Sequence, residues 1–208
     1  MEAIKRPYHH GDLRRAIIET AINMLDEDKG WQFTLREVAR RAGVSHAAPY
    51  KHFPDKAALL VELALIGFDR LREAVTAARS RSTGSLRDEF LAMAQAYVRF
   101  GASNPSLYRL MFSAEAGSVA DIHLNERALA SLGVLTDLIA QGQRQGWLRP
   151  RDVRSQVAAC WAQMHGLTLL AIDKLLLLPE KFGPDATDAA LNTLLEGLEK
   201  CEAASGSP

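Results

Sequence analysis

The sequence offers little that would support catalysis or metal binding. It has only two cysteines, Cys160 and Cys201, and neither belongs to a CxxC pair or to a cysteine and histidine cluster that would bind zinc. The spacing of its polar residues forms no nucleophile and base pair, no carboxylate dyad and no phosphate-binding loop. We therefore expect no catalytic residues, no metal ligands and no cofactor.

Long apolar runs are also missing. The most apolar stretch, Leu167 to Leu178, is interrupted by Asp173 and Lys174 and is too short to cross a bilayer. The N-terminus lacks the apolar core of a signal peptide. The sequence therefore predicts a cytoplasmic protein without a membrane partner.

The chain has no net charge, which at first argues against a nucleic-acid binder. Residues 1–56, however, hold ten Lys or Arg and eight Asp or Glu, a net charge of +2, which leaves −2 for the remainder. Any affinity for DNA should come from locally placed basic side chains and should fall with salt. Residues 1–8, with Lys5 and Arg6, are either a frayed terminus or an arm that reaches DNA.

No strand-like alternation is found, and helical periodicity runs through most of the chain. The apolar pattern and the positions of Asp, Ser, Gly and Pro predict helices over residues 12–28, 35–42, 46–53, 54–79, 85–103, 105–112, 121–142, 152–178 and 185–199. Asp12, Asp55 and Asp152 are the expected caps of three of them. The predicted fold class is all-α.

Residues 34–53 hold two short helical patterns joined by a turn that carries one glycine. The apolar positions of the first helix lie on one side of it: Leu35, Val38, Ala39 and Ala42. Thr34 and Glu37 can form a capping box at its start. Gly43 stands where a helix end needs a left-handed residue, and Ser45 can cap the second helix. This arrangement is typical of a helix-turn-helix.

The same stretch resembles the tetracycline-repressor (TetR) family of bacterial transcription regulators. The match runs in fixed order from about Leu13 to Leu60 and comprises Thr34, Val38, Ala39, Ala42, Gly43-Val44-Ser45, Tyr50, Phe53, Lys56 and Leu59-Leu60. The resemblance implies a three-helix DNA-binding domain of residues 1–56 and a larger helical domain of residues 57–208 for effector binding and dimerisation. Pro49 departs from the family pattern, and because proline disfavours helical geometry at Ala48, we expect a slightly distorted recognition helix.

The resemblance also implies which side chains contact DNA. The expected set is Thr34, Arg36, Ser45, His46, Ala47, Tyr50, Lys51, His52 and Lys56. The first residues of a recognition helix come nearest the bases, so Ser45, His46 and Ala47 are the expected readers of the groove.

Several of the remaining contacts are expected to be made with phosphates. Tyr50, His52 and Lys56 resemble phosphate ligands of the family. Thr34 is either a phosphate contact, a plain helix cap, or both. Arg36 either reaches the backbone or lies on a solvated helix face.

Two segments of the larger domain, Asn104–Phe112 and Trp161-x-x-x-His165-Gly166, are similar to a Trp-His-Gly ligand-domain subtype of the family. The expected lining of an effector pocket is Met93, Tyr97, Phe100, Tyr108, Phe112, Trp161 and His165. Side chains such as Met93, Tyr97, Phe100, Tyr108 and Phe112 are more often part of the core than of a pocket, and His165 can be a buried histidine bonded to a backbone carbonyl.

The last two long helices, 152–178 and 185–199, are the predicted dimer interface. Their apolar positions offer more surface than one bundle needs to bury: Val157, Cys160, Met164, Leu167, Leu170, Leu175, Leu191, Leu194, Leu195 and Leu198. Two such helices from each subunit would form a two-fold four-helix interface. The dimer would then place two recognition helices about 34 to 36 Å apart on a palindromic duplex.

The resulting hypothesis is a homodimeric repressor that binds a palindromic operator and is released by a small organic effector. A second hypothesis is a DNA-binding regulator without an effector, controlled by a protein partner or by its abundance. A third hypothesis, an enzyme that uses His165, His123 or Cys160, is disfavoured because no catalytic spacing accompanies these residues.

Overall fold

The computed structural model describes residues 10–27, 30–117, 122–177 and 185–200. Within these ranges the regular secondary structure is helical, apart from an isolated antiparallel bridge between Leu148 and Glu199. The predicted all-α class is therefore confirmed for the described residues. The expected N-terminal arm and Cys201 lie outside them.

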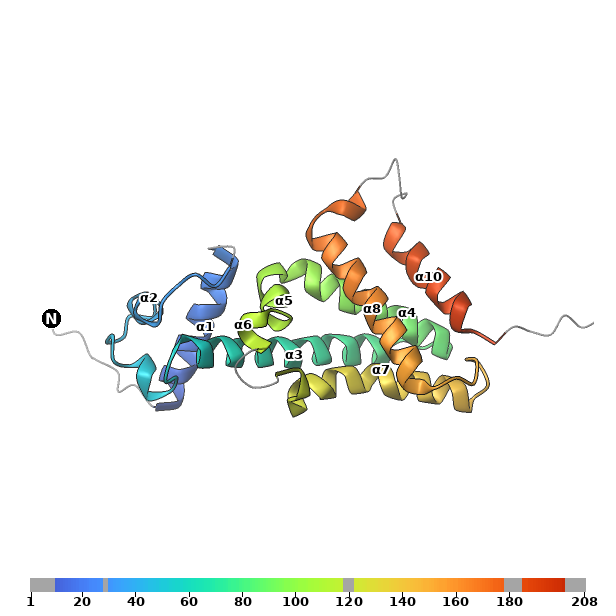
Figure 1. The fold of residues 1–208 in the computed structure, drawn as a ribbon, viewed down its shortest axis with the longest axis horizontal. Helices are drawn as coiled ribbons and strands as arrows, with labels where there is room; N and C mark the ends of the chain where they lie inside the picture. Colours follow the sequence, from blue (N-terminus) through green and yellow to red (C-terminus); the bar gives the residue numbers. More distant parts are fainter. Residues whose placement is uncertain (1–9, 28–29, 118–121, 178–184, 201–208) are drawn as a thin grey trace, which may run out of the picture. The chain divides into compact units, whose positions relative to one another are not determined.

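Figure 1 shows the helices of the described residues. In chain order they are α1 (His10–Glu27), α2 (Leu35–Arg41), the 3-10 helix η1 (Pro49–Lys51), α3 (Lys56–Arg81), α4 (Leu86–Ser103), α5 (Pro105–Met111), α6 (Ala114–Gly117), η2 (Ile122–Leu124), α7 (Glu126–Arg144), α8 (Val153–Ile172), η3 (Leu175–Leu177) and α10 (Ala186–Leu198).

Side-chain caps set two helix starts where the sequence predicted them. The Asp55 carboxylate accepts a hydrogen bond from the Ala58 N–H at 2.8 Å, at the start of α3. The Asp152 carboxylate accepts one from the Ser155 N–H at 2.9 Å, at the start of α8. Such a cap satisfies an N–H group that has no partner inside the helix, so both boundaries are encoded locally.

Other predicted boundaries are wrong. Helix α1 begins at His10, which is before the start expected at Asp12. Helix α8 ends at Ile172 and not near Leu178, because Asp173 forms its C-cap and Lys174 adopts a left-handed backbone with φ of 58°. The helix expected from residue 121 is divided into η2 and α7, and the short α6 was not predicted.

The chain forms two compact units. Unit 1 comprises residues 1–67 and 104–125, and unit 2 comprises residues 68–103 and 126–208. Helix α3 runs without a break from one unit into the other. The boundary that the sequence suggested, between residues 56 and 57, stays a prediction.

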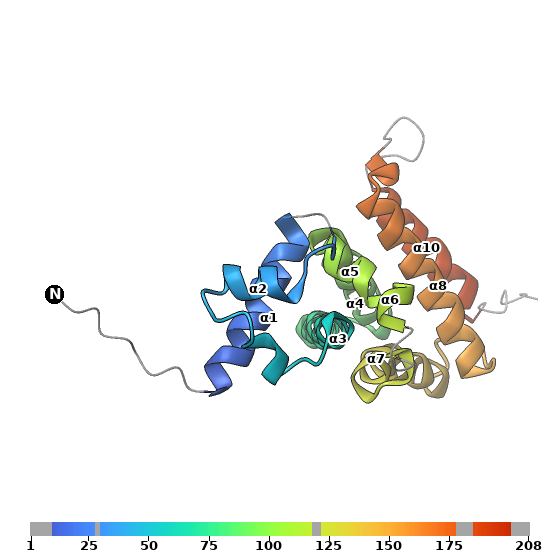
Figure 2. The ribbon, with the colours of Figure 1, turned by 60° about the vertical axis from the view of Figure 1, so that its left-hand side comes forward.

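Each unit has its own apolar core. In unit 1, α2 and α5 both pack against α1, and the largest fully buried side chains include Ile17, Leu25, Leu59, Leu63, Leu107 and Tyr108. In unit 2, α4 and α8 form the most extensive helix pair, and α7 and α10 pack against both (Figures 1 and 2). The core of unit 2 includes Phe90, Met93, Leu138, Cys160, Leu191 and Leu195.

The end of α10 is tied to the rest of unit 2 by polar contacts. The Arg87 Nε donates to the Glu199 carboxylate at 3.0 Å, and the Trp147 Nε1 donates to the same carboxylate at 3.2 Å. The Lys200 N–H also bonds the Trp147 carbonyl at 2.9 Å. Because these partners come from α4 and from the turn between α7 and α8, they hold the end of α10 against α4 and that turn.

Candidate nucleic-acid interface

The first helix of the candidate motif starts with the predicted capping box. Thr34 is extended, its hydroxyl accepts the Glu37 N–H at 3.2 Å, and the Glu37 carboxylate accepts the Thr34 N–H at 2.6 Å. The buried face of α2 consists of Leu35, Val38 and Ala39, and α2 packs against α1. The reciprocal hydrogen bonds therefore fix where α2 begins, and the apolar face fixes its rotation.

Removing the cap should destabilise unit 1. We expect Thr34→Ala to lower the free energy of unfolding by about 1 kcal/mol, because an N–H group of the first turn loses its side-chain acceptor. Urea denaturation of the variant and the parent measures the difference. Equal midpoints for the two proteins would contradict the structural role of this box.

The same box predicts a pH dependence. Hydrogen bonds from the Thr34 hydroxyl and N–H hold the pKa of Glu37 below its ordinary value of 4.5. A lowered pKa in the folded state stabilises the protein above the unfolded value, and this contribution is lost as pH falls through the folded value. The stability difference between the parent and Glu37→Gln should therefore be present at neutral pH, decline as the pH falls below 4.5, and vanish below the lowered pKa of the folded state.

The turn after α2 has the backbone that the sequence predicted. Gly43 has φ of 68°, in the left-handed region that glycine adopts without steric cost. The Val44 N–H then bonds the Ala39 carbonyl at 3.0 Å and satisfies one of the last carbonyls of α2. This turn directs the chain from α2 into the segment that was expected to read DNA.

The second helix of the motif differs from the prediction. Its N-cap is Ala48 and not Ser45, and only Pro49–Lys51 are helical, as the 3-10 helix η1. Because proline has no N–H, it fits the first position of a helix but deletes a hydrogen bond further in, which explains why η1 starts at Pro49. The N-cap Ala48 nevertheless has helical backbone angles, with φ of −61° and ψ of −45°, contrary to the expectation from Pro49. Ala48 and Pro49 are both buried, so packing overrides that local preference.

Most of the expected DNA contacts are exposed on unit 1. The exposed members are Thr34, Arg36, Ser45, His46, Ala47, Tyr50 and Lys51. Half the surface of Tyr50 is accessible. His52 and Lys56 are half-buried. Every member of the set therefore retains accessible surface.

Two of these side chains are held by their surroundings. The Lys56 Nζ lies 5.6 Å from the centre of the Phe33 ring, a cation–π distance that places its charge beside the first turn of α3. The Nε2 of His52 is buried and has no hydrogen-bond partner in the described part of the chain. A phosphate contact by His52 would therefore use Nδ1.

Arg14 is a supporting residue that the sequence did not reveal. Its guanidinium lies 5.6 Å from the centre of the Phe53 ring and forms an ion pair with Glu62 at 3.2 Å. Phe53 is buried directly after η1, so Arg14 helps to hold the end of the reading segment against α1 and α3. Nothing in the local pattern around Arg14 indicates a partner so far along the chain.

The residues expected to line an effector pocket are distributed over both units. Met93, Tyr97 and Phe100 lie on α4 and Trp161 and His165 on α8, all in unit 2. Tyr108 and Phe112 belong to unit 1.

The seven residues expected to line an effector pocket differ in their exposure to solvent. Met93, Tyr97 and Tyr108 are buried, whereas 39% of the Trp161 surface is accessible. The rings of Trp161 and His165 are 5.9 Å apart, and burial lowers the pKa of His165, which favours a neutral imidazole at pH 7. A role in ligand binding stays a prediction for all seven residues.

Two further observations concern the disfavoured enzyme hypothesis. Cys160 is fully buried on α8, and burial raises the pKa of its thiol to about 12. A thiol of this pKa is protonated at neutral pH and is a poor nucleophile. In the described ranges, no three His, Cys, Asp or Glu side chains gather as a metal site would require.

None of the described helices is long and apolar enough to cross a membrane.

Two protein-family models match this chain. Residues 17–63 match the family described as "Bacterial regulatory proteins, tetR family", and residues 90–198 match "Tetracyclin repressor-like, C-terminal domain". An uncharacterized HTH-type transcriptional regulator from Haemophilus influenzae is 30% identical over 108 residues, which cover 50% of this chain. The match spans 51%, about half, of that relative. The Trp-His-Gly subtype of the ligand domain stays a prediction.

Solved structures show the same fold. A protein of unknown function from Rhodococcus sp. RHA1 is 34% identical and superimposes with a TM-score of 0.80, over 94% of this chain and 100% of that one. A putative tetR family transcription regulator from Shewanella sp. PV-4 is 23% identical, with a TM-score of 0.68 over 90% of this chain and 98% of that one. At 23% identity the second likeness concerns the fold alone.

Proposed function

Because the chain belongs to the TetR family of bacterial transcription regulators, we propose that it is a homodimeric repressor that binds a palindromic operator and is released by a small organic effector. The observation that carries the proposal is the motif from α2 to the start of α3. It has a capped first helix, a glycine turn and a row of exposed polar side chains within the matched residues 17–63.

The exposed side chains form two groups, one suited to contact bases and one suited to contact phosphates. Ser45, His46 and Ala47 precede η1 and are small or polar, so they can approach base edges in the major groove. Tyr50 and Lys56 carry a hydroxyl and an ammonium group that can bind phosphates on either side of that groove. Since η1 is short, fewer side chains enter the groove than a full recognition helix would present.

A dimer is supported by an unusual outer surface on α8 and α10. Most of the residues that the sequence suggested for it are buried within the subunit: Val157, Cys160, Met164, Leu167, Leu191, Leu195 and Leu198. Small and apolar residues are exposed in their place: Ala158, Ala159, Trp161, Ala162 and Leu170 on α8, and Ala189, Thr193 and Gly197 on α10. Small residues let two helices approach closely, so this surface suits the four-helix interface of a two-fold dimer.

A charge introduced on this surface should separate the subunits. We expect Ala162→Glu to raise the dimer dissociation constant at least tenfold, because the carboxylate would be buried without a partner in the interface. Analytical ultracentrifugation over a range of concentrations measures the change. Ala130→Glu, the same substitution at an exposed position of α7, is the control. Unaltered association of Ala162→Glu would place the interface elsewhere.

The proposal also includes control of DNA binding by a small-molecule effector. The aromatic side chains of α4 and the Trp161–His165 pair of α8 supply apolar walls with one polar group, as a site for a small organic molecule requires. An effector that prefers the released state by about 1 to 3 kcal/mol would be sufficient to shift operator occupancy. A regulator controlled by a protein partner is the alternative, and a fully packed interior of unit 2 in a crystal structure would favour it.

The first test is selection of bound duplexes from a random DNA pool by the purified protein. The proposal predicts recovery of a palindrome whose half-sites are about one helical turn apart, with an affinity that falls as salt rises. Loss of binding on adding a small molecule would support the effector. A folded, dimeric protein that recovers no duplex, both as purified and after refolding from denaturant to remove bound ligands, would refute the DNA-binding role.

A further inference from the structure

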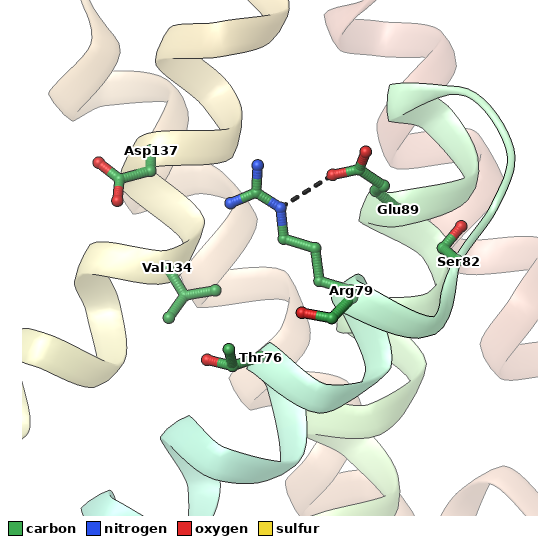
Figure 3. Close-up of a pocket in the computed structure, with 7 residues that line it drawn as sticks. Thr76, Arg79, Ser82, Glu89, Val134 and Asp137 are labelled. Atoms are coloured by element: carbon green, nitrogen blue, oxygen red, sulfur yellow. Dashed lines mark hydrogen bonds and ion pairs between the residues drawn. The ribbon is translucent and has the colours of Figure 1, made fainter.

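A polar pocket of about 450 Å³ lies within unit 2, where three helices meet (Figure 3). Its lining comes from the end of α3, the loop after it, α4 and α7: Thr76, Arg79, Ser80, Ser82, Glu89, Val134 and Asp137. The volume is within the range of small-molecule sites. None of these residues belongs to the expected aromatic lining, so the pocket is a separate candidate.

The basic group of the pocket is already neutralised. The Arg79 Nε donates to the Glu89 carboxylate at 2.9 Å, and the Arg79 Nη2 donates to the Gln141 Oε1 at 2.7 Å. Both charged side chains are about three-quarters buried, which strengthens their attraction relative to an exposed pair. Arg79 is therefore held in place by its bonds to α4 and α7, and it lines one side of the pocket.

Asp137 is the second carboxylate of the pocket, and its charge is not balanced. It is exposed on α7, and it has no hydrogen bond or ion pair with any residue in the part of the chain that the structure describes. Figure 3 places the Arg79 guanidinium between Asp137 and Glu89. With Arg79 and Glu89 paired, the pocket carries one net negative charge.

The remaining lining suits a ligand with both polar and apolar parts. The hydroxyl groups of Thr76, Ser80 and Ser82 can each donate or accept a hydrogen bond. Val134 offers an apolar contact for a short hydrocarbon chain. An anion would meet two carboxylates and a guanidinium that is already paired, so the charge balance disfavours it.

We propose that this pocket binds a small organic amine in its protonated form. The ammonium group donates to the Asp137 carboxylate, the hydrocarbon part lies against Val134, and the hydroxyl groups of α3 and its following loop bond a polar end of the ligand. The binding needs neither DNA nor a dimer, so its test is independent of the proposed regulatory function.

Isothermal titration calorimetry of the full chain with four six-carbon probes tests the charge preference. The probes are 6-amino-1-hexanol, 1,6-hexanediol, 6-hydroxyhexanoate and 6-aminohexanoate, which are cationic, neutral, anionic and zwitterionic at pH 7. We expect the amino alcohol to bind at one site per chain and at least tenfold more tightly than the diol, and the anion not to bind. Equal binding of the amino alcohol and the diol, or tighter binding of the zwitterion, would overturn the proposal.

Three variants locate the site. Asp137→Asn should weaken binding of 6-amino-1-hexanol about tenfold, while Glu73→Gln, which removes an exposed carboxylate of α3 outside the pocket, should leave it unchanged. Val134→Phe should abolish binding by filling the pocket without a change of charge. Circular dichroism melting checks that each variant is folded. Wild-type affinity in folded Asp137→Asn would place the amine elsewhere and refute the assignment.

Discussion

Replacement of both Tyr50 and Lys56 by alanine should lower the affinity for the selected palindrome by about 100-fold. Each side chain supplies one expected phosphate contact per half-site, and such contacts contribute about 0.5 to 1.5 kcal/mol each. A two-fold dimer loses four contacts, about 2 to 6 kcal/mol in total. The expected ratio corresponds to about 3 kcal/mol, in the lower half of this range. Fluorescence anisotropy with a labelled duplex measures the change.

The salt dependence of DNA affinity distinguishes the loss of phosphate contacts from misfolding of the variant. Removing Lys56 from both half-sites should reduce the slope of log affinity against log salt by about 2. Tyr50→Phe, which retains the ring and loses only the hydroxyl group, should cost less than Tyr50→Ala. Lys200→Ala removes an exposed lysine of unit 2 and serves as the control. A double variant with unaltered affinity would mean that the segment from η1 to α3 does not contact DNA.

Gly67→Leu should destabilise unit 1 by about 2 to 3 kcal/mol. A Cβ atom at Gly67 would lie 2.6 Å from the Met111 Sδ and 2.7 Å from its Cγ, closer than non-bonded atoms can approach. Met111 is fully buried on α5, so it has little space into which it can move. Overpacking of this kind typically costs about 1 to 3 kcal/mol, and leucine adds three further carbons. Thermal unfolding should show a melting temperature lower by about 5 to 10 °C.

Two further substitutions make this prediction specific. Gly133→Ala, on α7, meets no atom within 4 Å and should raise stability by about 0.5 to 1 kcal/mol, because alanine favours a helix. Met111→Ala should cost less in the Gly67→Leu background than in the parent, because leucine would occupy the vacated space. Strictly additive effects of Gly67→Leu and Met111→Ala on stability would indicate that Gly67 and Met111 are not packed together.

Features that depend on neighbouring residues were predicted from the sequence. The capping box of Thr34 and Glu37, the left-handed turn at Gly43 and the caps at Asp55 and Asp152 all lie where the spacing placed them. Each consists of a few hydrogen bonds or one backbone angle within about four residues, so the local sequence contains all the information. The helical periodicity that gave the fold class has the same local origin.

Features that depend on distant partners were decided by the tertiary structure. Ala48 is helical before a proline because both residues are buried, and Arg14 reaches Phe53 and Glu62 far along the chain. The periodicity of α8 and α10 showed that they have apolar faces, but which face packs against α4 and which faces outward follows from the whole bundle. The sequence by itself determined the helical class, the caps at Thr34, Asp55 and Asp152 and the glycine turn of the motif, because these depend on residues within a few positions. Only the tertiary structure decided which side chains are buried, which are free to bind and where the polar pocket lies, because these depend on contacts between elements far apart in the chain.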